Sequence, residues 1–292
     1  MAGYTGYVRM PSAQEIEAAQ KIPLIVADMR LCPTDEEMQL VYVKQLCDLA
    51  LDADKLPATA EAQTIHALLS ALSQHSCSDE ICVWTCLALR VLSEHHILTH
   101  KQSYCSSMYA MGAVSLVLQA MCYNQKDLQH IIRAARSSKK DFMLQGDGCK
   151  LMANLTENPE YRMNIASAGA IQVVLTAMVC NLILSEVQIY GCRMLLNMCQ
   201  TTSGDRDDAI VSVIVQADGI SIVQSALEHT FYELVSDAMT KIIFDLHDVL
   251  TNTTTPGYPE WASLLRAKKK STADDRRRRE MDQDAARKLR NA

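Results

Sequence analysis

The sequence predicts an all-α protein, and more specifically a solenoid built from stacked helices. Glycine and proline are scarce, with 10 Gly and 7 Pro among 292 residues, whereas sandwiches, barrels and propellers need turn residues every 8–12 positions or so. Apolar residues recur at helical three-to-four spacing, and we find no convincing alternating strand. A glycine-containing segment also repeats after 43 residues, within the period of roughly 40–47 residues found in helical repeats.

The elements divide into an irregular N-terminal arm (1–30), a helical body (31–250) and a C-terminal extension (251–292). Thr34 and Glu37 have the spacing of a capping box, which predicts a helix start. Asn158-Pro159 fits an N-cap and first helical residue, and Ser185 is expected to cap the next helix. Further apolar helical runs are 63–72, 78–92, 113–122, 148–155, 170–184, 187–199, 210–215, 220–227 and 234–250.

Two periodic glycine patterns organise the body. The segment Gly148-Cys-Lys-Leu-Met-Ala-Asn-Leu recurs as Gly191-Cys-Arg-Met-Leu-Leu-Asn-Met. A second glycine opens a short amphipathic helix at Gly112, Gly169 and Gly219, and each such helix precedes a polar break and a longer helix. One helix group cannot cover its own apolar face, so stacking of successive units is what stabilises them.

These segments, SAGAIQVVLTAM with VQIYGCRMLLNMC above all, resemble the armadillo-repeat family over 112–246, and less closely over 34–111. The resemblance implies a right-handed α-solenoid of helix trios, in which a small glycine at the start of the second helix allows close helix crossing. It also implies that the third helix lines a concave groove. Members of the family usually act as scaffolds or peptide receptors and not as enzymes.

The resemblance implies a partner-binding groove. Asn154 and Asn197 match third-helix asparagines that pair with the backbone of an extended peptide, and Lys150 and Arg193 lie one turn earlier on the same face. Such a groove would favour acidic peptides. The aligned positions in the flanking repeats are Val91 and Ile243, so the asparagine ladder has two rungs. The alternative interpretation is that these asparagines cap or bridge neighbouring loops.

Metal, cofactor and catalytic motifs are not found. Cys77, Cys82 and Cys86 lack paired CxxC spacing for zinc, and Cys82 and Cys86 fit one face of a buried helix. The sequence has no GxxxxGK[ST], GxGxxG after a strand, HExxH or GxSxG motif. The acidic cluster Asp205, Asp207 and Asp208 fits a solvated helix start better than a calcium loop. We therefore expect no enzyme activity and no cofactor.

The 11 cysteines, an odd number within apolar runs, predict reduced thiols and a cytoplasmic location. No secretory signal is visible, and the apolar stretch 170–184 falls short of a membrane span. A basic insertion near 123–141 has Lys126, Arg133, Arg136, Lys139 and Lys140, and is interpreted as a solvated loop or a partner contact.

Charge is unevenly divided along the chain. Residues 266–292 contain 11 basic and five acidic residues, a net charge of +6, which leaves −12 for the remainder. Such segregation is typical of an interaction tail, although a solubilising tail is the alternative. Aromatic residues are absent after Trp261, which disfavours nucleic-acid stacking. The basic runs are Lys268, Lys269 and Lys270, and Arg276, Arg277, Arg278 and Arg279.

The N-terminal sequence AGYTGYV, with Tyr4, Thr5, Gly6 and Tyr7, resembles a peptide at the start of several ciliary microtubule inner proteins. A disordered terminus is the alternative. Together with the basic tail, the resemblance of this N-terminal peptide predicts a non-catalytic cytoskeletal scaffold that binds tubulin, microtubules or other axonemal proteins in a cilium or flagellum. The alternative function is a soluble cargo or nuclear-transport adaptor that binds extended peptides, with the basic tail contacting import machinery.

Overall fold

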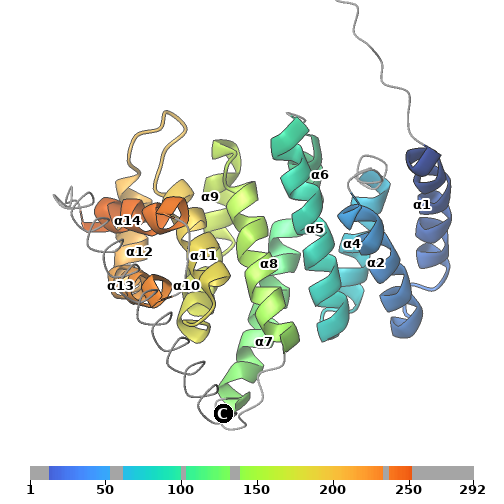
Figure 1. The fold of residues 1–292 in the computed structure, drawn as a ribbon, viewed down its shortest axis with the longest axis horizontal. Coiled ribbons are helices and arrows are strands. Elements are labelled where there is room, and N and C mark those ends of the chain that lie inside the picture. Colours follow the sequence, from blue (N-terminus) through green and yellow to red (C-terminus); the bar gives the residue numbers. More distant parts are fainter. Residues whose placement is uncertain (1–12, 53–61, 100–102, 132–138, 233–236, 252–292) are drawn as a thin grey trace, which may run out of the picture.

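The structure, a computed structural model of the chain, describes residues 13–52, 62–99, 103–131, 139–232 and 237–251 (Figure 1). Within these ranges the regular secondary structure is helical, and the single β-bridge joins Gln200 to Arg206. This confirms the all-α prediction. The helices are α1 (Ala13–Leu31), α2 (Glu36–Leu51), α4 (Ala62–Gln74), α5 (Asp79–Thr99), α6 (Ser103–Ala110), α7 (Ala113–Ile131), α8 (Lys139–Leu155), α9 (Pro159–Ser167), α10 (Ala170–Cys180), α11 (Ser185–Met198), α12 (Asp208–Gln216), α13 (Gly219–Tyr232) and α14 (Asp237–Thr251).

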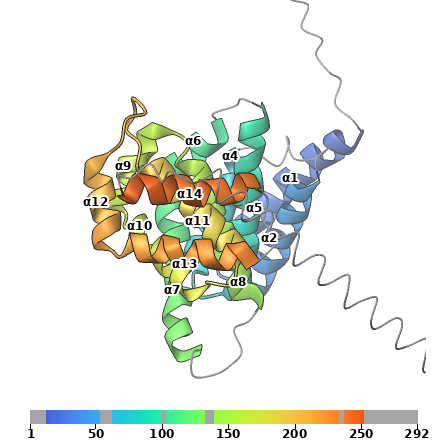
Figure 2. The ribbon, with the colours of Figure 1, turned by 60° about the vertical axis from the view of Figure 1, so that its left-hand side comes forward.

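The helices form a row of similar units along the long axis of the molecule (Figure 1). One series, α2, α5, α8, α11 and α14, packs helix against helix in that order, and we call its members the third helices. The helices of a second series also pack against one another in chain order, and we call them the second helices. They are α1, α4, α7, α10 and α13. Figure 2 shows α13 and α14 closing the C-terminal end. One continuous apolar core runs between the two series.

Three units begin with a short first helix that bends sharply into the second helix. The bends are 71° between α6 and α7, 77° between α9 and α10, and 78° between α12 and α13. Gly112 and Gly169 make two of these bends with φ of +80° and +83°, a backbone conformation that suits glycine. At the third bend Asp218 has the positive φ, and Gly219 begins α13.

No single helix in the described ranges is long and apolar enough to cross a membrane. Taken as pairs, the three bent units reach the length and composition of a span.

Of the three glycines expected to allow close helix crossing, Gly219 does so against Ile214 of α12, whereas Gly112 and Gly169 do not. A Cβ on Gly112 or Gly169 would meet nothing within 4 Å, so their role is the bend. A Cβ on Gly148 would lie 2.6 Å from Met121 Sδ, and one on Gly191 would lie 2.8 Å from Met178 Sδ. The third helices therefore use glycine to approach the second helices of their own units.

Several predicted boundaries need correction. The arm expected to be irregular to residue 30 becomes helical at Ala13, because Gly3, Gly6 and Pro11 all precede that point. Asp35, not Thr34, caps α2, and accepts a hydrogen bond from the Met38 amide. Leu184 takes the cap position of α11, which makes Ser185 its first helical residue.

Other boundary predictions are confirmed or extended. Asn158 caps α9 with Pro159 at its first position. Asp207 caps α12 by accepting from the amides of Ala209 and Ile210 at 3.1 Å, as expected of a helix start. The basic insertion is partly helical, because α7 continues to Ile131 and α8 already begins at Lys139.

Candidate functional site: the ladder between third helices

A buried glutamine joins each of several third helices to the second helix of its own unit. Gln188 Nε2 donates to the carbonyls of Met178 at 2.8 Å and Asn181 at 2.9 Å. Gln39 repeats this arrangement, donating to Met29 at 2.7 Å and Cys32 at 3.0 Å. The pair α1–α2 is therefore a genuine unit of the repeat, which sequence reasoning missed because α1 was expected to be irregular.

The same contact recurs in the unit that carries the insertion. Gln145 Nε2 donates to the Met121 carbonyl at 3.1 Å. Gln39 and Gln188 each follow their methionine by 10 residues, whereas Gln145 follows Met121 by 24. Fourteen extra residues therefore lie between Met121 of α7 and Gln145 of α8, and the contact between the two helices is kept.

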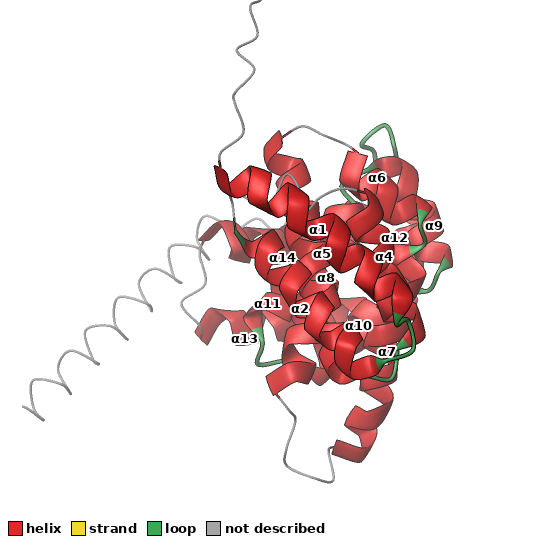
Figure 3. Cartoon of the chain, turned by 90° about the vertical axis from the view of Figure 1, so that its right-hand side faces the viewer, coloured by secondary structure: helices red, strands yellow, loops and turns green. Residues whose placement is uncertain are grey.

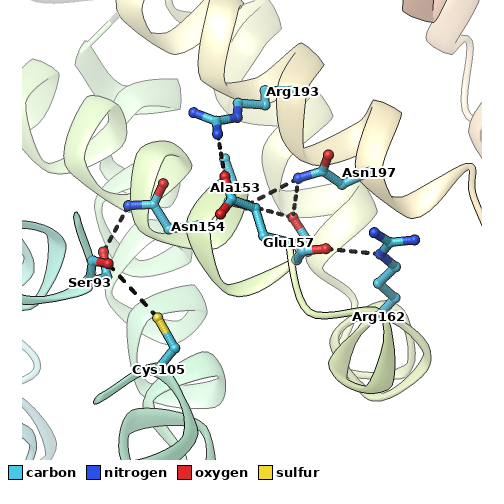
Figure 4. Close-up of polar contacts among 9 residues, drawn as sticks. Ser93, Cys105, Ala153, Asn154, Glu157, Arg162, Arg193 and Asn197 are labelled. Atoms are coloured by element: carbon cyan, nitrogen blue, oxygen red, sulfur yellow. Dashed lines mark hydrogen bonds and ion pairs between the residues drawn. The ribbon is translucent and has the colours of Figure 1, made fainter. Parts of the chain in front are cut away.

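A second set of contacts joins α8 to α5 and α11 to α8, each to the third helix of the preceding unit (Figure 4). Asn154 Nδ2 on α8 donates to Ser93 Oγ on α5 at 2.8 Å, and that hydroxyl donates to the Arg90 carbonyl at 2.6 Å. Asn197 on α11 donates to Thr156 Oγ1 and to the Ala153 carbonyl, both at 3.2 Å. The two asparagines therefore make equivalent bridges one unit apart.

The cations one turn before the asparagines form the matching ion pairs. Lys150 Nζ lies 2.5 Å from Glu94 Oε1, and Arg193 pairs with Glu157. Each glutamate directly follows the hydroxyl residue of the asparagine bridge, in the sequences Ser93-Glu94 and Thr156-Glu157. Burial acts to lower the pKa of Lys150, but Glu94 outweighs it and the pKa is raised. The ammonium is therefore held in its charged form.

The contacts change the interpretation of the predicted groove. Asn154 is only 4% exposed, and its amide is committed to Ser93. Asn197, Lys150 and Arg193 are likewise engaged with the preceding unit. The four residues bridge to the preceding unit, and their positive charges are already paired with carboxylates. The alternative interpretation expected the asparagines to contact neighbouring loops, whereas Ser93 and Ala153 lie within α5 and α8. An open two-rung asparagine ladder with spare positive charge is not the geometry observed.

Arg90 adds a further link that the sequence did not indicate. Its Nε donates to Asp147 Oδ1 at 2.6 Å, and both side chains are about 15% exposed, Arg90 at 16% and Asp147 at 14%. Burial raises the pKa of Asp147, and Arg90 opposes this shift without reversing it. The Gly146-Asp147-Gly148 sequence lies inside helix α8, and the carboxylate of Asp147 pairs with Arg90 of the neighbouring helix α5.

The ladder does not extend with the same residues into α14. Counted from the start of each helix, Val249 of α14 corresponds to Asn197 of α11, whereas the sequence alignment placed Ile243 there. By the same count, Asp245 stands where α11 has Arg193, and it pairs with Lys241 of its own helix at 2.5 Å. The asparagine and cation bridges therefore span α5, α8 and α11.

A small cavity of about 190 Å³ lies between α1, α2 and α4. Its ionisable lining residues are Arg30 and His66. No group of three or more His, Cys, Asp or Glu side chains in the described ranges could hold a metal ion. None of the 11 cysteines, all of which lie in the described ranges, forms a disulfide, and Cys82 and Cys86 are buried in α5.

The remaining predicted site residues fall outside the described ranges. These are the N-terminal arm with Tyr4, Thr5, Gly6 and Tyr7, and the basic tail with Lys268–Lys270 and Arg276–Arg279.

Comparison with known proteins yields little. No protein-family model matches the chain, and no curated protein matches its sequence. Among solved structures, an engineered protein that was a structural genomics target is similar, with 17% sequence identity and a TM-score of 0.45. The similarity covers 80% of this chain and 97% of that one.

Proposed function

We propose that the chain is a non-catalytic protein-interaction scaffold of armadillo type, a right-handed superhelix of helix trios. The observation that carries the proposal is the repeated bridge between α5, α8 and α11, in which asparagine binds hydroxyl and cation binds glutamate. Bridges of this kind fix the third helices relative to one another before any partner arrives. A preformed surface loses less conformational entropy on binding, which favours affinity.

The surface formed by these helices suits a protein partner. Trp84 and Tyr190 are half-buried, and each lies beside a lysine of the preceding third helix. Lys44 Nζ lies 5.7 Å from the centre of the Trp84 ring, and Lys150 Nζ lies 4.9 Å from the centre of the Tyr190 ring. The ion pair Arg193–Glu157 is about one third exposed on both sides. Aromatic side chains surrounded by paired charges are typical of protein interfaces, where Tyr, Trp and Arg are enriched.

In the cell, we propose, the chain is a microtubule-associated scaffold of the cytoskeleton that is located in the axoneme. This proposal is supported by the sequence of the Gly-Tyr arm and by the +6 tail, which complements an acidic tubulin surface. The tail would act by charge, so its attachment weakens as salt screens it, with a Debye length of about 8 Å at physiological ionic strength.

Co-sedimentation of the purified full chain with microtubules tests this proposal. We expect the full chain to pellet at low salt and to be lost from the pellet when residues 1–10 or 266–292 are deleted. A variant with Arg276–Arg279 changed to Lys keeps the charge and should still pellet, whereas the same four residues changed to Gln should not. Full chain that stays in the supernatant at low salt would contradict the microtubule proposal.

A further inference from the structure

The N-terminal end of the row of helices exposes a surface that resembles the interior of the solenoid. Figure 3 views this end, where α1 and α2 lie foremost. We define the N-terminal face by five exposed residues, three apolar and two acidic, namely Leu24, Glu37, Met38, Val41 and Asp48. Solenoids usually end in a capping repeat whose outer face is polar.

The later units show what these positions do when a preceding unit is present. The third residue of α2 is Met38, which is 39% exposed, whereas Ile81 of α5 and Val187 of α11 at the same position are 0% exposed. Leu24 is 67% exposed and lies five residues before the methionine that the buried glutamine contacts. Leu116 and Val173, which hold the same position in α7 and α10, pack against the core. The N-terminal face thus exposes side chains of a kind that the solenoid otherwise buries.

The sixth residue identifies the side that faces the preceding unit. In α5 and α11 it is Trp84 and Tyr190, and each lies beside a lysine of the preceding third helix. In α2 the same position is Val41, which is 46% exposed. Val41 therefore marks the surface on which a further helix would stack.

The charges on this face specify the kind of helix. Glu37 occupies the position of Glu80, which binds Lys44 of the preceding third helix at 3.1 Å. Asp48 occupies the position of Asn197, which contacts the preceding unit through hydrogen bonds. Both are exposed carboxylates, so an incoming helix would need apolar residues at its centre and cations at its flanks.

We propose that the N-terminal face docks a basic amphipathic helix of a partner protein. The helix would stack on α2 as a preceding third helix would, in the way that α2 stacks on α5 and α5 on α8. A second copy is less well matched, because a two-fold contact would set this face with its two carboxylates against itself. The proposal shares with the scaffold function only the assumption of a protein partner.

The test uses the purified full chain and two synthetic helices of the length of α2, each locked by a side-chain cross-link. Both carry the same leucine stripe, flanked by lysines in one and by glutamates in the other. We expect fluorescence anisotropy to show about tenfold tighter binding of the lysine helix. Val41→Lys should weaken that binding about tenfold. Val213→Lys, at a valine with a similar exposure of 49% on α12, should leave it unchanged.

Three outcomes would overturn the proposal. The first is equal affinity for the two helices, and the second is equal behaviour of Val41→Lys and Val213→Lys. The third is a dimer in sedimentation equilibrium that Val41→Lys dissociates, which would assign the face to a second copy. Circular dichroism of both variants checks that they fold, as expected for exposed positions. Because no microtubule is present, this result is independent of the co-sedimentation experiment.

Discussion

Asn154 donates a 2.8 Å hydrogen bond to Ser93, a residue 61 positions earlier in the chain, and the bond is buried between α5 and α8. The hydroxyl it reaches is itself fixed by the Arg90 carbonyl. This relay ties the orientation of one third helix to the next. Its loss should therefore be measurable in the stability of the whole row.

Ser93→Ala should lower the free energy of unfolding by about 1–3 kcal/mol, because it leaves the buried Asn154 amide without an acceptor. Urea unfolding measures this change. The matched control is Ser212→Ala, which removes an exposed hydroxyl that accepts from Gln216 on α12 and should cost less than about 0.5 kcal/mol. Equal losses in the two variants would contradict a special role for the Asn154 bridge.

Two glycine-to-alanine changes should have opposite effects on the free energy of unfolding. In Gly219→Ala the new Cβ would lie 2.6 Å from the Ile214 carbonyl oxygen, a backbone atom, and should destabilise the chain by about 1–3 kcal/mol. In Gly146→Ala the closest atom is Glu186 Oε2 at 3.5 Å, so better helix propensity should stabilise by about 0.5–1 kcal/mol. Thermal unfolding compares the two, and a stabilising Gly219→Ala would refute the packing argument.

Alkaline pH should destabilise the fold. Burial raises the pKa of five thiols to about 12, those of Cys47, Cys82, Cys105, Cys149 and Cys199. An unfolded thiol ionises near pH 8.5, so between about pH 9 and 12 the folded state binds more protons and stability falls as pH rises. Each thiol contributes a slope of up to about 1.4 kcal/mol per pH unit.

Urea unfolding at a series of alkaline pH values measures this slope. Cys149→Ala should make the fall of the unfolding free energy with pH less steep, by the contribution of one thiol. The same change lowers stability at neutral pH because it leaves a cavity. A slope that is unchanged by Cys149→Ala would show that the buried thiols do not control the alkaline transition.

Thiol modification should follow burial. Cys77 and Cys180 are exposed, and Cys149 and Cys192 are buried. Burial also raises the pKa of Cys180, which lowers its thiolate fraction. We expect iodoacetamide at neutral pH to label Cys77 first and Cys180 more slowly. Peptide mass spectrometry measures the order, and early labelling of Cys149 or Cys192 in folded protein would contradict the packing.

The sequence predicted the helices well where helical periodicity and capping residues coincide. Asn158-Pro159 marks the start of α9, and the repeated glycines lie in α8 and α11 as expected. It failed over α1, because an internal Pro23 and an apolar outer face obscure the amphipathic pattern that normally identifies a helix. The signal that was overlooked is Gln39, which shares its spacing from a methionine carbonyl with Gln188.

The candidate site could be located but not interpreted from sequence. The 43-residue repeat correctly singled out Lys150, Asn154, Arg193 and Asn197 as equivalent positions. Their partners, Ser93-Glu94 and Thr156-Glu157, lie in the preceding units, and only the stacking of α5, α8 and α11 brings them within reach. Pairing between distant segments is a property of the tertiary structure, so a single helix's pattern does not contain it.

The asparagine and cation bridges of α8 and α11 run in one direction along the chain, whereas Arg90 of α5 donates forward to Asp147 of α8. Asn154, Lys150, Asn197 and Arg193 each bind residues that precede them, and the buried glutamines also bind carbonyls earlier in the sequence. As the chain leaves the ribosome from its N-terminus, the asparagines and cations of α8 and α11 therefore find their partners in the preceding units already synthesised. The arrangement of these bridges is therefore compatible with folding of the row unit by unit from its N-terminal end.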